Sequence, residues 1–206
     1  MAKVLIVFYS ATGNALQVAK AVDEGARAAG AETRLRKVRE LAPAEVIERM
    51  PAWKATAEAM RAIPEAELAD LEWADGYVFG SPTRYGVMSS QLKQFFDTTG
   101  PLWGQGKLAN KAVAAFAGAA NAHGGQETTI LTIYNVMYHW GAIIVPPGYT
   151  DPQIYAAGGN PYGLSYTDTR GSPQPEAVLN AARYLGGRVA RVAAALVASR
   201  AELVTP

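Results

Sequence analysis

The segment KVLIVFYSATGNALQVAKAV, residues 3–22, decides the fold. The apolar run at 4–9 is rich in β-branched and aromatic residues and predicts a buried strand. It stops at residues 10–13, and residues 14–29 then place apolar side chains at the three- and four-residue spacing of a helix that ends at Gly30. A strand, a short loop of small and hydroxyl residues and a helix start in direct succession are typical of an anion-binding site.

The same alternation continues along the chain. Further strands are predicted at residues 32–38, 75–80, 111–118 and 142–145, and helices at 89–98, 126–140 and 175–200. Residues 40–70 predict short helical pieces, whereas residues 148–175 show no clear period. The last helix carries Arg183, Arg188 and Arg191 for a solvated face. Strands that alternate with helices imply a parallel sheet with helices on both faces.

Composition excludes several classes of protein. The 206 residues suit one domain, and with 19 basic and 18 acidic residues the net charge of +1 argues against a nucleic-acid-binding protein. With no cysteine, disulfides, thiolate metal sites and cysteine nucleophiles are excluded, and two histidines without spaced carboxylates predict no metal site. The chain shows no signal-peptide pattern and no apolar span of membrane length, so the expectation is a cytoplasmic protein with no membrane contact.

Three loops follow the three most strand-like segments, at residues 10–15, 81–86 and 118–125. The first matches neither the dinucleotide-binding glycine pattern nor a P-loop. It offers the Ser10 and Thr12 hydroxyls, Gly13 and free backbone N–H groups at a helix start. Neutral donors of this kind suit the monophosphate of a bound cofactor, although an ordinary helix cap by Ser10 or Thr12 is the alternative.

The other two loops supply different chemistry at the same edge of the predicted sheet. SPTRYG, residues 81–86, offers a hydroxyl, a cation and an aromatic ring, which suit a flat heterocycle with hydrogen-bonding edges. GAANAHGGQ, residues 118–126, lets backbone approach a ligand closely. The alternative for SPTRYG is a surface turn, and the alternative for GAANAHGGQ is a flexible loop.

Together these loops resemble the flavodoxin-like superfamily and, within it, the WrbA family of NAD(P)H:quinone oxidoreductases. The resemblance runs over residues 2–196, on MAKVLIVFYSATGN, FGSPTRYGVMSSQLKQFFDTTGPLW, GGQETTI, IIVPPGY, NPYGLSYTD and ARYLGGRVA. It implies a flavodoxin-like, doubly wound α/β fold with a five-stranded parallel sheet in the order 2-1-3-4-5. It also implies a single domain over residues 1–206, with family-type insertions at about 40–70 and 148–175.

The resemblance implies FMN as the cofactor and assigns residues to it. The phosphate contacts fall on Ser10, Ala11, Thr12, Gly13, Asn14 and Ala15. The flavin-ring loop falls on Pro82, Thr83, Arg84 and Tyr85, and the third contact loop on Gly118, Ala119, Ala120, Asn121, Ala122, His123 and Gly124. His139 corresponds to a family histidine that touches FMN from a neighbouring subunit, and it is the candidate catalytic side chain.

The implied reaction is the two-electron reduction of quinones to hydroquinones, with NADH or NADPH as hydride donor in a ping-pong sequence. Trp103 corresponds to the family tryptophan at the substrate cavity. Thr12 stands where some members carry an aromatic that stacks near the nicotinamide, so it is also a candidate for substrate binding. A homotetramer is expected. A flavodoxin-type one-electron carrier and a non-enzymatic binding module on the same fold are the alternatives.

Overall fold

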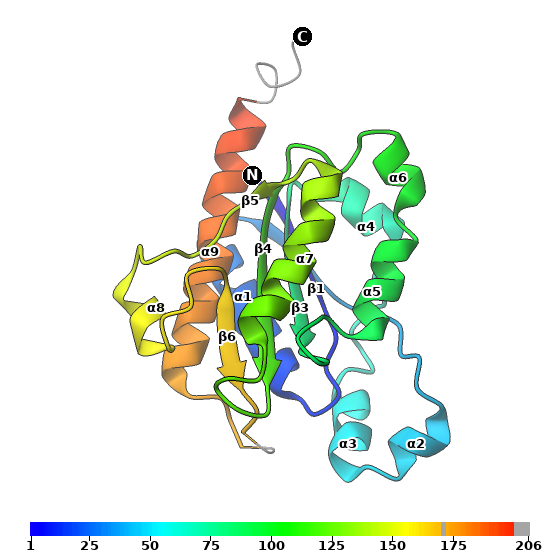
Figure 1. The fold of residues 1–206 in the computed structure, drawn as a ribbon. Helices are drawn as coiled ribbons and strands as arrows, with labels where there is room; N and C mark the ends of the chain where they lie inside the picture. Colours follow the sequence, from blue (N-terminus) through cyan, green and yellow to red (C-terminus); the bar gives the residue numbers. More distant parts are fainter. Residues whose placement is uncertain (170–171, 200–206) are drawn as a thin grey trace.

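Strands and helices alternate along the computed structural model, which describes residues 1–169 and 172–199 (Figure 1). The strands are β1 (Lys3–Phe8), β2 (Glu32–Lys37), β3 (Gly76–Pro82), β4 (Ala112–Ala119), β5 (Ile143–Ile144) and β6 (Leu164–Thr167). The helices are α1 (Asn14–Ala28), α2 (Ala44–Glu48), α3 (Pro51–Ala59), α4 (Leu68–Trp73), α5 (Ser90–Asp97), α6 (Gly100–Gly104), α7 (Gln126–Trp140), α8 (Pro152–Ala156) and α9 (Glu176–Ala198).

The sheet is parallel throughout and runs β2-β1-β3-β4-β5, which confirms the predicted strand order. A further strand, β6, also pairs with β4. β5 pairs with the start of β4 at Ala112 and Val113, and β6 pairs with its end, from Phe116 to Ala119. The edge beside β4 is therefore built from two short strands, with α8 and its flanking turns between them.

β6 and α8 lie within residues 148–175, where the sequence shows no clear period and no element was predicted. In β6, the buried residues Leu164 and Tyr166 alternate with the less buried Ser165 and Thr167. Four residues are too few for that alternation to stand out from the surrounding glycines, prolines and tyrosines. The short helices α2, α3 and α4 agree with the prediction for residues 40–70.

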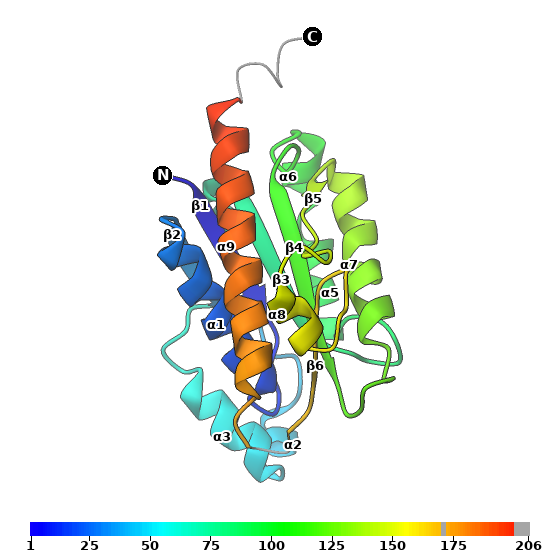
Figure 2. The ribbon, with the colours of Figure 1, turned by 90° about the vertical axis from the view of Figure 1, so that its left-hand side faces the viewer.

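Two helical layers enclose the sheet, as Figure 2 shows: α1 and α9 on one face, α5 and α7 on the other. α1 and α9 approach so closely that a Cβ on Gly25 would lie 1.9 Å from the carbonyl oxygen of Arg183. Aromatic side chains fill the opposite face, where the Phe96 ring lies 4.9 Å from Phe79 and 5.6 Å from Trp140 between centroids. Both layers are thus tightly packed, and they hold the strand ends in fixed positions.

The arginines of α9 are only partly a solvated face. Arg191 is exposed, but Arg188 is half-buried and its Nε donates to the Pro146 carbonyl at 2.9 Å. Arg183 forms ion pairs with Glu24 and Glu176. Through its bond to Pro146, Arg188 anchors the segment after β5. The predicted end of this helix at residue 200 lies outside the described residues.

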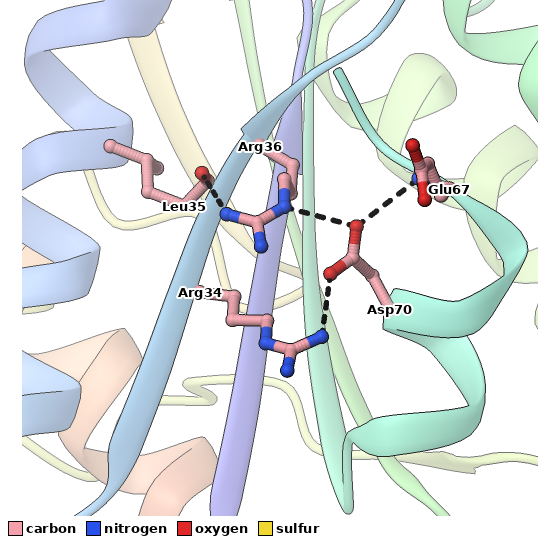
Figure 3. A network of polar contacts seen from close by, with 5 residues as sticks. All are labelled: Arg34, Leu35, Arg36, Glu67 and Asp70. Carbon is pink, nitrogen blue, oxygen red and sulfur yellow. Dashed lines mark hydrogen bonds and ion pairs between the residues drawn. The ribbon is translucent and has the colours of Figure 1, made fainter. Parts of the chain in front are cut away.

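A buried ion-pair cluster fixes α4 against the edge strand β2 (Figure 3). The Asp70 carboxylate accepts from Arg34 at 2.9 Å, from Arg36 at 3.0 Å and from the backbone N–H of Glu67 at 3.1 Å. Burial acts to raise the pKa of Asp70, but these three donors outweigh it and hold the pKa below its usual range. The cluster lies beside the sheet and ties its exposed edge to the fold.

The carboxyl ends of β1, β3, β4 and β6 meet at one end of the sheet, at the bottom of Figure 1. There the backbone N–H of Tyr9 donates to the Gly80 carbonyl at 3.0 Å, and that of Thr83 donates to the Gly118 carbonyl at 2.7 Å. α2 and α3 lie at this end as well. Ligands of doubly wound sheets bind at such an end.

Candidate functional site

A cavity of about 310 Å³ opens at the carboxyl end of the sheet, between the three predicted loops and β6. Its volume lies at the small end of the usual range for ligand sites. Its lining contains two residues that were not predicted, Tyr166 and Asp168. The rest of the lining brings together most of the predicted residues: Ser10, Ala11, Thr12, Asn14, Ala15, Pro82, Thr83, Arg84, Gly118, Ala119, Ala120, Asn121 and Gly124. The predicted residues outside this lining are Gly13, Tyr85, Ala122, His123, Trp103 and His139.

The first loop is held by the hydroxyl of Ser10. Its Oγ accepts from the backbone N–H of Gly13 at 3.2 Å and of Leu16 at 3.3 Å. The N-cap of α1 is Gly13 rather than Ser10 or Thr12. Gly13 has φ +89°, which favours glycine. Within the described chain, the backbone N–H groups of Asn14 and Ala15 have no acceptor. The Ser10 hydroxyl therefore leaves two N–H donors at the start of α1 for an anion.

The side chain of Asn14 is occupied elsewhere. Its Nδ2 donates to the Asp168 carboxylate at 2.7 Å, and its Oδ1 accepts from the Thr169 hydroxyl at 2.9 Å and from Gln174 Nε2 at 2.6 Å. The residue thus fastens the segment after β6 to the start of α1. What Asn14 offers to a ligand is its backbone N–H.

The second loop is a tight turn. The backbone N–H of Arg84 donates to the Val87 carbonyl at 2.8 Å, and that of Val87 donates back to Arg84 at 3.1 Å. Tyr85 at the tip has φ +53°, which is uncommon for a bulky residue, and its side chain is fully exposed. The Thr83 hydroxyl accepts from the backbone N–H of Gly86 at 3.1 Å. The turn therefore directs Thr83 and Arg84 to the cavity and Tyr85 to solvent.

The third loop is braced from within and against the second. Gln126 Nε2 donates to the Asn121 carbonyl at 2.6 Å, and the backbone N–H of Gly124 donates to Gln126 Oε1 at 3.0 Å. A Cβ on Gly125 would lie 2.9 Å from the Cα of Gly86, so the two loops touch through glycine backbone. Ala122 and His123 line a neighbouring hollow of about 610 Å³ instead.

Tyr166 and Asp168 join the cavity without having been predicted as site residues. Tyr166 packs its ring so close to β4 that a Cβ on Gly118 would lie 2.0 Å from it. Burial raises the pKa of Tyr166, so its hydroxyl stays protonated. The backbone N–H of Asp168 donates to the Ala119 carbonyl at 2.8 Å. The alternation in LSYT places Tyr166 in a strand but is too short to stand out in the sequence, and Asp168 lies beyond it.

Trp103 and His139 lie together at the other end of the sheet. Trp103 Nε1 donates to the His139 carbonyl at 2.7 Å, and both side chains are exposed. α6 precedes the start of β4, and α7 ends just before β5, so this pair lies where strands begin (Figure 1). The chain therefore does not bring them to its own cavity.

The lining fits FMN better than it fits a metal. Among the described residues that line the cavity, Arg84 is the one cation and Asp168 the one anion. Neutral donors at the start of α1 suit a monophosphate, and the two glycine-paired loops leave backbone close to a flat ring. In residues 1–169 and 172–199, no group of three His, Cys, Asp or Glu is placed to hold a metal ion. In the same residues, no helix has the length and apolar character to cross a bilayer.

A family model described as NADPH-dependent FMN reductase matches residues 2–154. The chain belongs to this family. A Deinococcus radiodurans protein named NAD(P)H dehydrogenase (quinone) is 56% identical over 165 residues, which cover 80% of this chain and 82% of that protein. An Archaeoglobus fulgidus protein of the same name is 43% identical over 195 residues, 94% and 98% of the two chains.

Solved structures agree on the fold. A WrbA-like flavodoxin from Agrobacterium tumefaciens has a TM-score of 0.66 at 24% identity and covers 95% of this chain and 99% of its own. A flavodoxin from the domain Archaea has a TM-score of 0.60 at 17% identity. The flavodoxin-like fold and the relationship to quinone oxidoreductases, both predicted from the sequence, are thereby confirmed. The roles of individual site residues stay predictions.

Proposed function

We propose that this chain is an FMN-dependent enzyme that uses NADH or NADPH to reduce quinones to hydroquinones by two electrons. The observation that carries the proposal is the cavity in which all three predicted loops meet, with neutral phosphate donors at one side and Arg84 at the other. Membership of the FMN reductase family and the names of the curated relatives support it.

In this proposal the chain binds and orients, and FMN, when bound, supplies the hydride chemistry. The Asn14 and Ala15 N–H groups and the Ser10 and Thr12 hydroxyls hold the phosphate. Thr83 and the backbone of the third loop flank the ring. Arg84 stabilises the negative charge that accumulates in the cavity on reduction, or the phosphates of the nicotinamide donor. Solvent protonates the product because the cavity opens to water.

We place the substrate-facing roles of Trp103 and His139 in an assembly. Both are exposed at the end of the sheet opposite the cavity, so they reach a cavity only if it belongs to another copy of the chain. The expected homotetramer would supply such a copy. The cytoplasmic location also stays a prediction.

Steady-state kinetics of FMN-loaded protein test the reaction. We expect oxidation of NADH or NADPH that depends on benzoquinone, with parallel double-reciprocal lines because the two substrates use one cavity in turn. FMN-free protein is the control. Bound FMN without quinone-dependent turnover would favour a one-electron carrier, and failure to take up FMN would favour a binding module. Sedimentation analysis of the same preparation tests the tetramer.

A further inference from the structure

The carboxylate of Glu40 gathers five hydrogen bonds. This residue lies between β2 and α2 and does not line the cavity. Its Oε2 accepts from the Tyr9 hydroxyl at 3.0 Å and from Trp53 Nε1 at 3.2 Å. Its Oε1 accepts from Gln91 Nε2 at 2.9 Å, from the backbone N–H of Leu41 at 2.8 Å and from that of Ala42 at 2.9 Å.

The donors come from the separate parts that surround the cavity. Tyr9 directly precedes Ser10 of the first loop. Gln91 lies in the first turn of α5, which follows the second loop. The N-cap of α5, Ser89, donates its backbone N–H to Ser81 Oγ at the end of β3 at 2.9 Å. Trp53 belongs to α3. One carboxylate therefore connects the residue before the first loop, the first turn of α5 after the second loop, and α3.

α3 also reaches the phosphate-binding turn. Thr56, a buried residue of α3, has its hydroxyl 3.4 Å from the position that a Cβ on Gly13 would take. The Thr56 hydroxyl donates to the Ala52 carbonyl at 2.8 Å, which fixes its orientation. Movement of α3 would therefore change the space around Gly13. The Trp53 bond to Glu40 holds α3 in place.

The charge of Glu40 is kept by hydrogen bonds rather than by a cation. Burial acts to raise its pKa, but the donors from Ala42, Gln91, Tyr9 and Leu41 together hold the pKa below its usual range. In residues 1–169 and 172–199, no lysine or arginine forms an ion pair with it. Neutral donors from α3, from α5 and from the residue after β1 thus meet at one carboxylate, and removal of that carboxylate would leave all of them without this acceptor.

We propose that Glu40 is a positioning residue, which holds the first two cavity loops and α3 in the arrangement that binds FMN. This inference rests on the proposed function, because it concerns the same cavity. It adds a residue that lies outside the lining and acts through Tyr9, Gln91 and Trp53.

The test is Glu40→Gln, which keeps the shape and replaces one carboxylate oxygen by an NH₂ group. At least one of the present donors then faces another donor. We expect the dissociation constant for FMN, measured by quenching of flavin fluorescence, to rise about tenfold, equivalent to about 1.4 kcal/mol. Glu45→Gln is the matched control, because it removes one charge from the exposed surface of α2. It should leave the constant unchanged.

A second readout separates positioning from general destabilisation. Hydrogen exchange of the FMN-free protein should show faster exchange in residues 40–59 of Glu40→Gln but not of Glu45→Gln. Trp53→Phe removes one donor, keeps the carboxylate and should weaken FMN binding less; it also serves if Glu40→Gln fails to fold. An unchanged FMN constant in a folded Glu40→Gln or in Trp53→Phe would overturn the inference. Wild-type protein that binds no FMN would instead overturn the proposed function.

Discussion

The two ends of the sheet present their candidate residues in opposite ways. At the carboxyl end, Ser10 and Asn14 are buried, and hydrogen bonds join the second loop to the third and the start of α1 to the segment after β6. At the other end, Trp103 is 56% exposed, and its indole N–H donates to the carbonyl of His139. A single chain thus has a cavity lined by three of its own loops at one end and, at the other, exposed candidate side chains that do not line it. Different substitutions should therefore affect cofactor binding and quinone binding separately.

Effects on FMN binding and on quinone binding can be assigned to the two ends of the sheet only if they are distinguished from a general loss of stability. Asp70→Asn should cause the largest effect, a loss of about 3 kcal/mol in the free energy of unfolding at pH 7, because Arg34 and Arg36 lose their buried partner. Affinity for FMN and the KM for quinone should not change. Urea unfolding measures the free energy of unfolding, FMN titration measures the affinity, and steady-state kinetics measure the KM.

This loss should depend on pH in one direction. Folding lowers the pKa of Asp70, so its stabilisation is present above the usual carboxyl pKa of about 4 and disappears as the pH falls through the lower value of the folded state. The difference between wild type and variant should therefore shrink in acid. Asp97→Asn, at an exposed ion pair with Lys93, is the control and should cost less than about 1 kcal/mol. A pH-independent difference would contradict the charge-based explanation.

The cavity end is tested by two glycines that share a left-handed backbone conformation. Gly13 has φ +89° and Gly30 has φ +84°, so alanine at either should cost about 1 kcal/mol of stability. Only Gly13→Ala should also weaken FMN binding, about tenfold or 1.4 kcal/mol, since it changes the turn before the free N–H groups of α1. Equal FMN affinity in the two variants would remove the first loop from the site.

Sequence reasoning predicted the first loop because its pattern is local. Residues 3–22 contain the strand, the hydroxyls, the glycine and the helix start in one continuous segment. The strand order followed from the resemblance, and the structure confirms it. Asp168 could not be found in this way, because its place depends on a hydrogen bond to Asn14, 154 residues away.

The hydrogen bonds of the Glu40 carboxylate were also beyond sequence reasoning, because they join residues that are distant in the chain. Its donors Tyr9 and Gln91 lie 31 and 51 residues away, and nothing in the local sequence RELAP marks Glu40 as a half-buried acceptor for them. Tyr85 shows a different limit of prediction from sequence. The segment SPTRYG indicated an aromatic ring at the cavity, but the left-handed turn at Tyr85 and Gly86 points the ring to solvent. The direction of a side chain in a turn depends on φ, which residue types alone do not determine.

The opposite end is tested by Trp103→Ala. If Trp103 serves a cavity in another copy of the chain, the KM for benzoquinone should rise about fivefold, equivalent to about 1 kcal/mol, while affinity for FMN stays the same. Trp103→Phe keeps a ring and loses only the bond to the His139 carbonyl, so it should lie close to wild type. An unchanged KM in the alanine variant would remove Trp103 from the site, and weaker FMN binding would break the separation of the two ends.

The smallest effect is expected at Tyr85, where backbone stability favours glycine and contact with a substrate would favour an aromatic ring. A tyrosine at φ +53° is strained, so Tyr85→Gly should leave the folded protein as stable as wild type or up to about 1 kcal/mol more stable. A fully exposed ring gives up no packing when it is removed. If the ring stacks on a bound quinone or nicotinamide, the KM for that substrate should rise two- to threefold, roughly 0.5 kcal/mol. Arg84 and Thr83 remain in place, so the affinity for FMN should not change.

Greater stability of Tyr85→Gly with unchanged kinetics would mean that the strain at Tyr85 serves neither substrate. Greater stability with a raised KM would mean that the turn holds an aromatic ring in solvent for a ligand or a second copy of the chain.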